Sequence, residues 1–592
     1  MRKSNIVIAI VLGLTVFSAC SSLNKMVKLA ASQQVDIVPN PLELHGDSVK
    51  YDMAVVLPAK MLPEKYVYKL TAFYKSGDTE VEAGTMTFDA ADFPDSKTTT
   101  SRQTDTFAFL YDPAMGNGNL EVMGTAVDEK GENKSTPRTT VAQGLITTSQ
   151  LVEDVYFPTY AASGYTDQEE LAPTNVSMYF DRGSAVLKSS ETGGKKGKAF
   201  SAFIADKNVT KTVTITGTHS PEGLETVNSK LSENRAAAIE KYYRSQMKKY
   251  DYKGLADSVK FILKPIVEDW TEFKTALDAY EGVSADQKSE ILKIVNGAGT
   301  FEDKEKALQK LDSYSAIFKD IYPNLRAAKT EVLTVVEKKT NAEIAVIAKQ
   351  IAEQDSTATD SLSIGELMFA ATLTPSLTEK EAIYKAATKQ EGNWESHNNL
   401  GAVYLEMAIA AEGDEKNQKL EMALAQLEIA ANKNNASEVQ ANMATAYALQ
   451  GNTAQAYDAV VASLSSNPGS NAGGINGVKG TLEIKKGDYE SAIATLGSAD
   501  ETPQVAFNKG LALLLNKDLE NSITGFDSAI ELDAEYAKAY YASAVAAARL
   551  GKAEDVLSNL KTAVEKDPSL KEKALADLEF RTFATQVTEA LN

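Results

Sequence analysis

The stretch ITGTHSPEGLETVNSKLSENRAAAIEKYY, residues 215–243, decides the fold of the middle of the chain. It continues an alternation of apolar residues, Val213 and Ile215, that is typical of a β-strand. A polar loop follows, and from about Asn228 the residues are mostly good helix formers. A strand, a loop and a helix in this order place the loop at the carboxyl end of a strand, where the ligands of α/β sheets usually bind.

The flanking residues predict the rest of an α/β domain over residues 174–340. Upstream, NVSMYFDRGSAVL predicts a strand that ends at Asp181, and 199–208 predicts a short amphipathic helix before the strand 209–217. A strand, a crossover helix and a second strand make a βαβ unit, which puts the loop 218–226 at the carboxyl end of the second strand.

A helical insertion is expected inside this domain, over residues 269–322. It follows a third predicted strand, 259–266, and contains a capping box from Ser284 to Gln287. Its aromatic residues recur at helical spacing, which favours a packed core over a cofactor site. A returning strand is predicted over 325–336.

This domain resembles the OmpA-like peptidoglycan-associated family. The resemblance rests on MYFDRGSAVL, on VTITGTHS and on the helix motif NxxLSxxRAxxV, with Ile in place of Val. The matching residues of the helix are Asn228, Leu231, Ser232, Arg235, Ala236 and Ile239. A helical insertion is similar to a variant seen in Bacteroidetes outer-membrane lipoproteins. In the family, a loop aspartate and the helix arginine hold the ammonium and carboxylate of diaminopimelate in the stem peptide.

The resemblance implies a peptidoglycan site made of Arg235, Asn228, Ser220 and Glu222. Arg235 is retained, and its planar guanidinium suits a carboxylate. The family's GHTD is GTHS here, so Ser220 stands where the aspartate is expected, and Glu222 lies two residues further on. Three interpretations remain open: peptidoglycan binding with a displaced acid, binding of another peptide or glycan, and a structural role in which Arg235 holds the loop.

The N-terminus indicates export and lipidation. Arg2 and Lys3 precede an apolar run from Ile6 to Phe17, which is too short to span a bilayer that takes about 20 residues. We expect residues 1–19 to be a signal peptide. Cys20, the only cysteine, follows small residues as in a bacterial lipobox, so it is the predicted lipidation site. Ordinary secretion with a chance cysteine is the alternative.

Between the N-terminus and the α/β domain we expect a tether over 20–34 and an antiparallel β-sandwich over 35–150. Short segments of period two are separated there by clusters of Gly, Pro, Asn and Asp, and six or seven strands are predicted. The polar stretch 151–173 is interpreted as a linker.

The C-terminal part is predicted to be entirely helical. Residues 341–361 are expected to form a helix and a linker, and residues 362–592 an all-α solenoid. A repeat emerges when small residues are aligned at intervals of about 34, the tetratricopeptide (TPR) period. The aligned residues are Gly401, Ala444, Gly480, Gly510 and Ala544.

Such an array resembles TPR proteins, which leave a concave groove for an extended peptide or a helix. Candidate partner-binding residues in the groove are Asn399, Asn442, Asn508 and Lys509, although they could equally be solvated.

Composition argues against two classes of function. A formal charge of −20 disfavours nucleic-acid binding, because that affinity depends on Lys and Arg displacing counterions. The three histidines, His45, His219 and His397, lie in separate modules, and no GxSxG, HExxH or phosphate-binding glycine loop occurs. We therefore expect no enzyme, no metal and no cofactor.

Two hypotheses of function follow. The first is an outer-membrane lipoprotein facing the periplasm, whose OmpA-like domain contacts peptidoglycan and whose TPR array recruits a protein of a secretion or outer-membrane assembly machine. The second is a surface-exposed binding or adhesion lipoprotein whose OmpA-like domain has lost wall binding. Ser220 favours the second, and Arg235 with the full helix motif favours the first.

Overall fold

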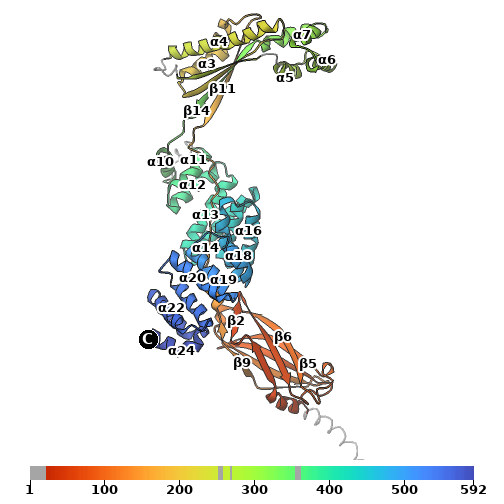
Figure 1. Ribbon diagram of the computed structural model, residues 1–592, viewed down its shortest axis with the longest axis vertical. Coiled ribbons are helices and arrows are strands. Elements are labelled where there is room, and N and C mark those ends of the chain that lie inside the picture. Colours follow the sequence, from red (N-terminus) through yellow and green to blue (C-terminus); the bar gives the residue numbers. More distant parts are fainter. Residues whose placement is uncertain (1–21, 251–257, 267–269, 354–361) are drawn as a thin grey trace, which may run out of the picture. The chain divides into compact units, whose positions relative to one another are not determined.

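The computed structural model describes residues 22–250, 258–266, 270–353 and 362–592. They form two compact units, one made of the chain up to Tyr165 together with Asn341–Asn592, and one made of Thr166–Thr340. Figure 1 shows the elements of each unit. Among the described residues, no helix is both long enough and apolar enough to cross a membrane.

The first unit begins with a helix over 22–29 that packs on a β-sandwich. Leu23 and Met26 of this helix lie in the sandwich core, 3% and 1% exposed. The tether expected over 20–34 is therefore, in its described part, this docked helix, the turn η1 (Ala30–Ser32) and the first residue of β1. This segment packs on the sandwich because Leu23, Met26 and Ala30 recur at helical spacing. That spacing places all three side chains on the face toward the sandwich core.

The sandwich is made of two sheets around one core. The first sheet has the order β1-β3-β2-β10, with β6 paired to β3, and the second has the order β5-β4-β7-β8, with β9 paired to β7. The described residues 22–165 contain ten strands of the sandwich: β1 (Gln34–Val38), β2 (Leu42–His45), β3 (Ser48–Leu57), β4 (Val67–Ser76), β5 (Thr79–Asp89), β6 (Ser101–Leu110), β7 (Asn119–Val127), β8 (Asn133–Ser135), β9 (Thr139–Gln143) and β10 (Leu145–Ile146). Alternate residues of β3, in the first sheet, and of β4, in the second sheet, are buried, so these strands contribute side chains to the inner faces of both sheets.

The same unit continues, from Asn341, as an array of antiparallel helix pairs. The first helices of five successive pairs are α13 (Trp394–Ala410), α15 (Ser437–Leu449), α17 (Ala472–Lys485), α19 (Pro503–Leu515) and α21 (Ala537–Arg549). Their partners are α14 (Gly413–Lys433), α16 (Thr453–Ser465), α18 (Tyr489–Leu496), α20 (Leu519–Leu532) and α22 (Ala553–Lys566). Shorter helices flank them: α10 (Asn341–Ala352), α11 (Ile364–Ala370), α12 (Leu377–Gln390), α23 (Leu570–Ala576) and α24 (Ala584–Leu591). The predicted all-α solenoid is thus confirmed as a helical array.

Small residues sit where the paired helices cross. A Cβ at Gly401 would meet the side chain of Leu427 at 2.8 Å, and one at Gly480 would meet Leu496 at 2.4 Å. Gly510 and Gly525 face each other so closely that a Cβ at Gly525 would lie 2.6 Å from the Gly510 Cα. The aligned small residues therefore set the approach of each pair, as their spacing predicts.

The second unit is a four-stranded sheet with the order β11-β14-β12-β13. Its strands are β11 (Leu171–Tyr179), β12 (Thr210–Gly217), β13 (Lys260–Pro265) and β14 (Ala327–Val335). The returning strand β14 is central and antiparallel to both neighbours, β11 and β12, whereas β12 and β13 are parallel. β11 begins inside the expected linker, and its Pro173 is tolerated because β11 is an edge strand.

Helices α3 (Lys195–Ala205) and α4 (Glu225–Lys249) pack on this sheet, and the insertion adds a second, separate helical core to the unit. The crossover helix α3 and the long α4 contribute Phe200, Ala236 and Ile239 to the core. The insertion forms its own core from α5 (Thr271–Ala279), α6 (Ala285–Asn296), α7 (Phe301–Leu308), α8 (Tyr314–Asp320) and α9 (Tyr322–Leu325). The capping box at Ser284 and Gln287 is present, and the aromatic residues of the insertion are packed as core.

Candidate functional site

The loop after β12 and the motif helix α4 enclose a buried polar cluster in the second unit. Ser220, Glu222, Asn228 and Arg235, all selected from the sequence, are brought together and are each at least nine-tenths buried. The cluster also contains Arg326, the residue just before β14, which sequence reasoning missed.

Each guanidinium nitrogen of Arg235 donates to a backbone carbonyl. Its Nε donates to the Ser184 oxygen at 3.0 Å, Nη1 to Thr218 at 2.7 Å and Nη2 to Asp181 at 3.3 Å. The side chain is 1% exposed. Burial lowers the pKa of the Arg235 guanidinium to about 10; the charge of Arg326 adds to this effect and Glu222 opposes it. Arg235 thus holds the loops that follow β11 and β12, the arrangement expected of the structural interpretation.

Arg326 binds the side chains of Ser220 and Glu222. Its Nε donates to the Ser220 hydroxyl at 2.9 Å and to Glu222 Oε1 at 3.1 Å, and its Nη2 lies 2.7 Å from the same carboxylate oxygen. Asn228 donates to the Glu222 carbonyl at 3.2 Å. The second carboxylate oxygen of Glu222 is buried without a hydrogen-bond partner. Ser220 therefore serves as an acceptor for an arginine, for which its hydroxyl is suited.

The rim of this cluster is formed by Arg182 and by the insertion. Arg182 is largely exposed and lies 3.8 Å from Glu222, while its guanidinium stands 5.2 Å from the Phe318 ring. His219 packs edge-on against Phe301 and lies 3.4 Å from Glu225. Two arginines beside one glutamate leave an excess of positive charge, which suits an anionic group such as a carboxylate.

A second candidate site is the face of the array formed by the first helices of the pairs, which we call the inner face. A segment of the chain itself occupies it. Residues 152–165, which we call the strap, contain no helix or strand and follow the turn η4 (Thr148–Leu151). The strap meets α19 first, through Glu153, and α13 later, through Ala161, so it runs against the order of the repeats. These residues belong to the stretch interpreted as a linker from its polarity.

Three asparagines of the array bind the strap through its main chain. Asn508 accepts from the Glu153 N–H at 2.9 Å and donates to its carbonyl at 2.7 Å. Asn442 makes the same pair of bonds with Thr159, both at 2.8 Å, and Asn399 with Ala161, at 2.7 and 3.0 Å.

Each side-chain amide thus satisfies both backbone groups of one strap residue, which is how an extended peptide is bound irrespective of its sequence. The candidates Asn399, Asn442 and Asn508 therefore all contact the strap, a segment of the same chain.

Side chains of the strap add specificity. Thr159 donates from its hydroxyl to the Glu438 carbonyl at 3.0 Å, and Tyr160 donates to Glu406 at 2.8 Å. Phe157 lies over Gly474, where a Cβ would approach its ring to 2.3 Å. At the other end of the strap, the acidic Glu153 and Asp154 pair with Lys538 and Lys485.

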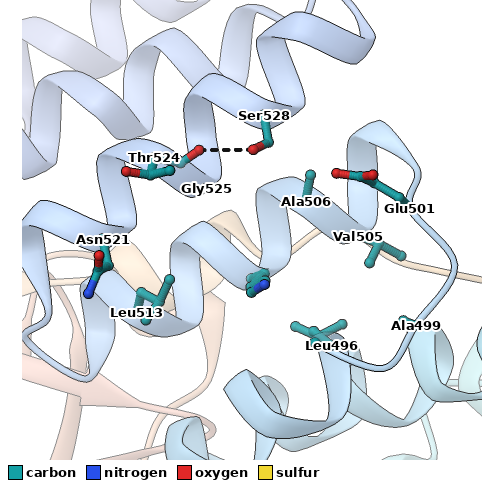
Figure 2. Close-up of a pocket in the computed structure, with 12 residues that line it drawn as sticks. Leu496, Ala499, Glu501, Val505, Ala506, Leu513, Asn521, Thr524, Gly525 and Ser528 are labelled. Atoms are coloured by element: carbon teal, nitrogen blue, oxygen red, sulfur yellow. Dashed lines mark hydrogen bonds between the residues drawn. The ribbon is translucent and has the colours of Figure 1, made fainter.

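Lys509, the fourth candidate, lies apart from the asparagines. It lines a pocket of about 530 Å³ between the end of α18 and helices α19 and α20. Figure 2 shows this pocket with Glu501 and Val505 at one side and Asn521 at the other. Ser528 donates to the Thr524 carbonyl at 3.1 Å there. The lining is mostly small and apolar, with Glu501 and Lys509 as its charged residues, so it suits an apolar group more than a strongly charged one.

The predicted lipidation site and the expectation of no metal site concern other parts of the chain. Cys20 and the signal peptide lie outside the described residues. Among the described residues, no group of three or more His, Cys, Asp or Glu side chains is placed to hold a metal ion.

Comparison with known proteins identifies likenesses over the helical part. No family model and no curated protein matches the chain. MamA (41-end) from Desulfovibrio magneticus RS-1 is 21% identical and covers 28% of this chain and 96% of its own, with a TM-score of 0.25. YrrB, described as a TPR protein with an unusual peptide-binding site, is 19% identical and covers 35% of this chain and 97% of its own, with a TM-score of 0.27. A MamA structure labelled MSR-1 is 21% identical and covers 30% of this chain and 97% of its own, with a TM-score of 0.26.

Proposed function

We propose that this chain is a non-enzymatic scaffold whose helical array binds an extended polypeptide through its main chain. The observation that carries this proposal is the set of paired hydrogen bonds from Asn399, Asn442 and Asn508 to the strap. Backbone recognition by side-chain amides is a peptide-binding chemistry, and it needs no reacting group.

The test replaces the strap, residues 152–165, with a Gly/Ser linker of equal length in the full chain. A labelled synthetic peptide of the strap sequence is then titrated and followed by fluorescence anisotropy. We expect the strap-replaced chain to bind the peptide and the wild type to bind it far more weakly, because the tethered strap competes at high effective concentration. A scrambled peptide is the control. Absence of binding by a strap-replaced chain that keeps its helical circular dichroism would contradict the proposal.

The scaffold acts at the outer membrane, held by a lipid on Cys20. What supports this is the basic start, the short apolar run and the small residues before Cys20. Two or more acyl chains provide stable anchoring. Metabolic palmitate labelling tests it: the wild type incorporates label and Cys20→Ala does not. Label-free wild-type protein, released into the medium, would refute it.

The second unit contacts peptidoglycan from the periplasm. This proposal is supported by the OmpA-like motif of α4 and by the excess positive charge beside Glu222. Because the Arg235 donors are engaged by carbonyls, the ligand's carboxylate would face Arg326 and Arg182 instead. Sedimentation with purified sacculi tests it, and we expect Arg182→Gln to lower the bound fraction while Lys552→Gln, just before α22, leaves it unchanged. Equal sedimentation of wild type and Arg182→Gln would refute this arrangement.

The alternative function is a surface-exposed binding or adhesion lipoprotein without wall contact. The carbonyl bonds of Arg235 and the use of Ser220 by Arg326 favour it. Protease shaving of intact cells separates the two proposals, since a periplasmic protein survives it and a surface protein is cleaved.

The scaffold recruits a protein partner of a secretion or outer-membrane assembly machine. Because the strap fills the inner face, the pocket beside Lys509 is the part of the array that we propose for contact. Co-purification from a tagged strain, comparing wild type with Lys509→Glu, tests this. Identical recovery of every partner with both proteins would remove Lys509 from the contact.

A further inference from the structure

The end of the sandwich that carries the N-terminal helix has a pocket lined by lysines. The pocket measures about 400 Å³, and its lining includes Lys25, Lys60 and Lys97 together with apolar Met26 and Leu62. Lys25 is on the helix over 22–29, and Lys60 and Lys97 are on loops of the sandwich.

Two of these lysines lack a counter-charge. Among the described residues, no carboxylate lies within 4.0 Å of Lys25 or Lys60, whereas Lys97 pairs with Glu64 at 2.9 Å. The Lys97–Glu64 pair is exposed on both sides, so it is weak and open to exchange. The cluster is thus locally basic within a chain of formal charge −20.

The lysine cluster lies close to Cys20 in the sequence, and this closeness indicates which surface the cluster contacts. Its helix is fixed to the sandwich through Leu23 and Met26, which are buried in the sandwich core. Cys20 precedes Ser22, the first described residue of this helix, by only two residues, and two residues span at most about 7 Å. If Cys20 carries the lipid, only Ser21 lies between the lipid-bearing residue and the described start of this helix.

We infer that this lysine cluster binds the anionic headgroups of the membrane that holds the lipid anchor. The inference rests on the proposed anchoring at Cys20. Ser22 lines the same pocket as the three lysines, so a lipid on Cys20 would bring this pocket to the bilayer surface, where the phosphates attract lysines. A lysine near an anionic surface contributes to binding additively with its neighbours, and the apolar Met26 and Leu62 give the pocket a surface that tolerates acyl chains.

The test uses the mature chain with Cys20→Ser, so that binding reports the protein surface alone. Partition onto phosphatidylcholine vesicles is compared with partition onto vesicles that also contain phosphatidylglycerol. We expect binding only to the anionic vesicles, weakening with added salt, and we expect the triple variant Lys25→Gln, Lys60→Gln, Lys97→Gln to lower the partition coefficient about 100-fold. A control variant neutralises Lys552, the residue before α22, and Lys561 on that helix.

Each outcome is decisive. Equal partition of the wild type and the triple variant, or equal binding to both vesicle types, overturns the inference. Loss of vesicle binding in inorganic phosphate, but not in chloride of the same ionic strength, shows a free-anion site and also overturns it. Palmitate labelling of Cys20 in cells is read separately: labelled protein with no anionic preference refutes the lysine contact alone, and unlabelled protein with such a preference refutes the anchoring alone.

Discussion

Replacing Asn442 with alanine is the sharpest perturbation of the strap. Asn442 accepts from the Thr159 N–H and donates to the Thr159 carbonyl, both at 2.8 Å, in a site where both residues are buried. The carbonyl keeps a second donor, Asn398, at 3.2 Å, but the N–H is left without a partner. Asn442 also donates to Asn398 Oδ1 at 2.9 Å, and that bond is lost too. One orphaned buried N–H and two lost hydrogen bonds together cost about 2–4 kcal/mol.

This cost falls on strap docking, so the assay is hydrogen exchange of the peptide that covers residues 152–165 in the full chain. A loss of about 2–4 kcal/mol corresponds to exchange about 30- to 1,000-fold faster for the strap amides when local opening controls exchange. Asn521→Ala is the control, because Asn521 is exposed on α20 and donates to Asp518 at the start of the same helix, away from the strap.

Unchanged protection of the strap in Asn442→Ala would show that the paired hydrogen bonds do not hold it. Faster exchange over the whole array, as opposed to the strap, would show instead that Asn442 supports the helices. Combining Asn442→Ala with Asn399→Ala is expected to be non-additive, since Asn398 bonds to both asparagines.

Three further predictions concern other parts of the chain. Glu222→Gln should destabilise the second unit by about 1–3 kcal/mol by leaving buried Arg326 without its carboxylate, seen as faster exchange of β14 amides; unaltered exchange would contradict the ion pair. Burial raises the pKa of Glu305, so the folded state binds this proton more tightly than the unfolded state does. The stability of the wild type relative to Glu305→Gln should therefore fall as the pH rises above 4.5, the ordinary pKa of the group. A difference in hydrogen exchange of α7 between the two proteins that does not change with pH would refute this. Gly525→Ala should lower the thermal midpoint, at a cost of about 1–3 kcal/mol, because its Cβ would press on the Gly510 backbone, and an unchanged midpoint would show that the helices can separate freely.

The repeats and the α/β unit were predictable because local patterns determine them. Alternation in β12 and the good helix formers of α4 set those elements, and the small residues at Gly401 and Gly510 fixed the phase of the helix pairs. The helix α4 begins at Glu225, a few residues before the expected start, as is usual for boundaries. Such features depend on neighbours in sequence, which a single chain displays directly.

The strap and Arg326 could not be predicted in the same way, because their partners are distant in sequence. Thr159 and Asn442 are separated by 283 residues, and Ser220 and Arg326 by 106. One signal was present: Asn399, Asn442 and Asn508 each stand two residues before an aligned small residue, so they share one position of the repeat. That regularity marks a ladder of amides, but nothing local identifies what binds to it.

The N-terminal helix was missed for a different reason. Residues 22–30 are short and contain only a few apolar side chains, so their helical stripe is weak until it packs on a surface. Leu23 and Met26 gain their burial from the sandwich, which the sequence pattern of the helix does not show.

The order of synthesis gives the strap a further consequence. Residues 152–165 leave the ribosome, and any export channel, well before Asn341, where the first helix of the array begins. The array is therefore made in the presence of its own ligand, and each new repeat can close over a stretch of peptide that is already waiting. The helices from α11 to α19 are synthesised in that order. They therefore meet the strap from its C-terminal end, Tyr165, toward its N-terminal end, Glu153.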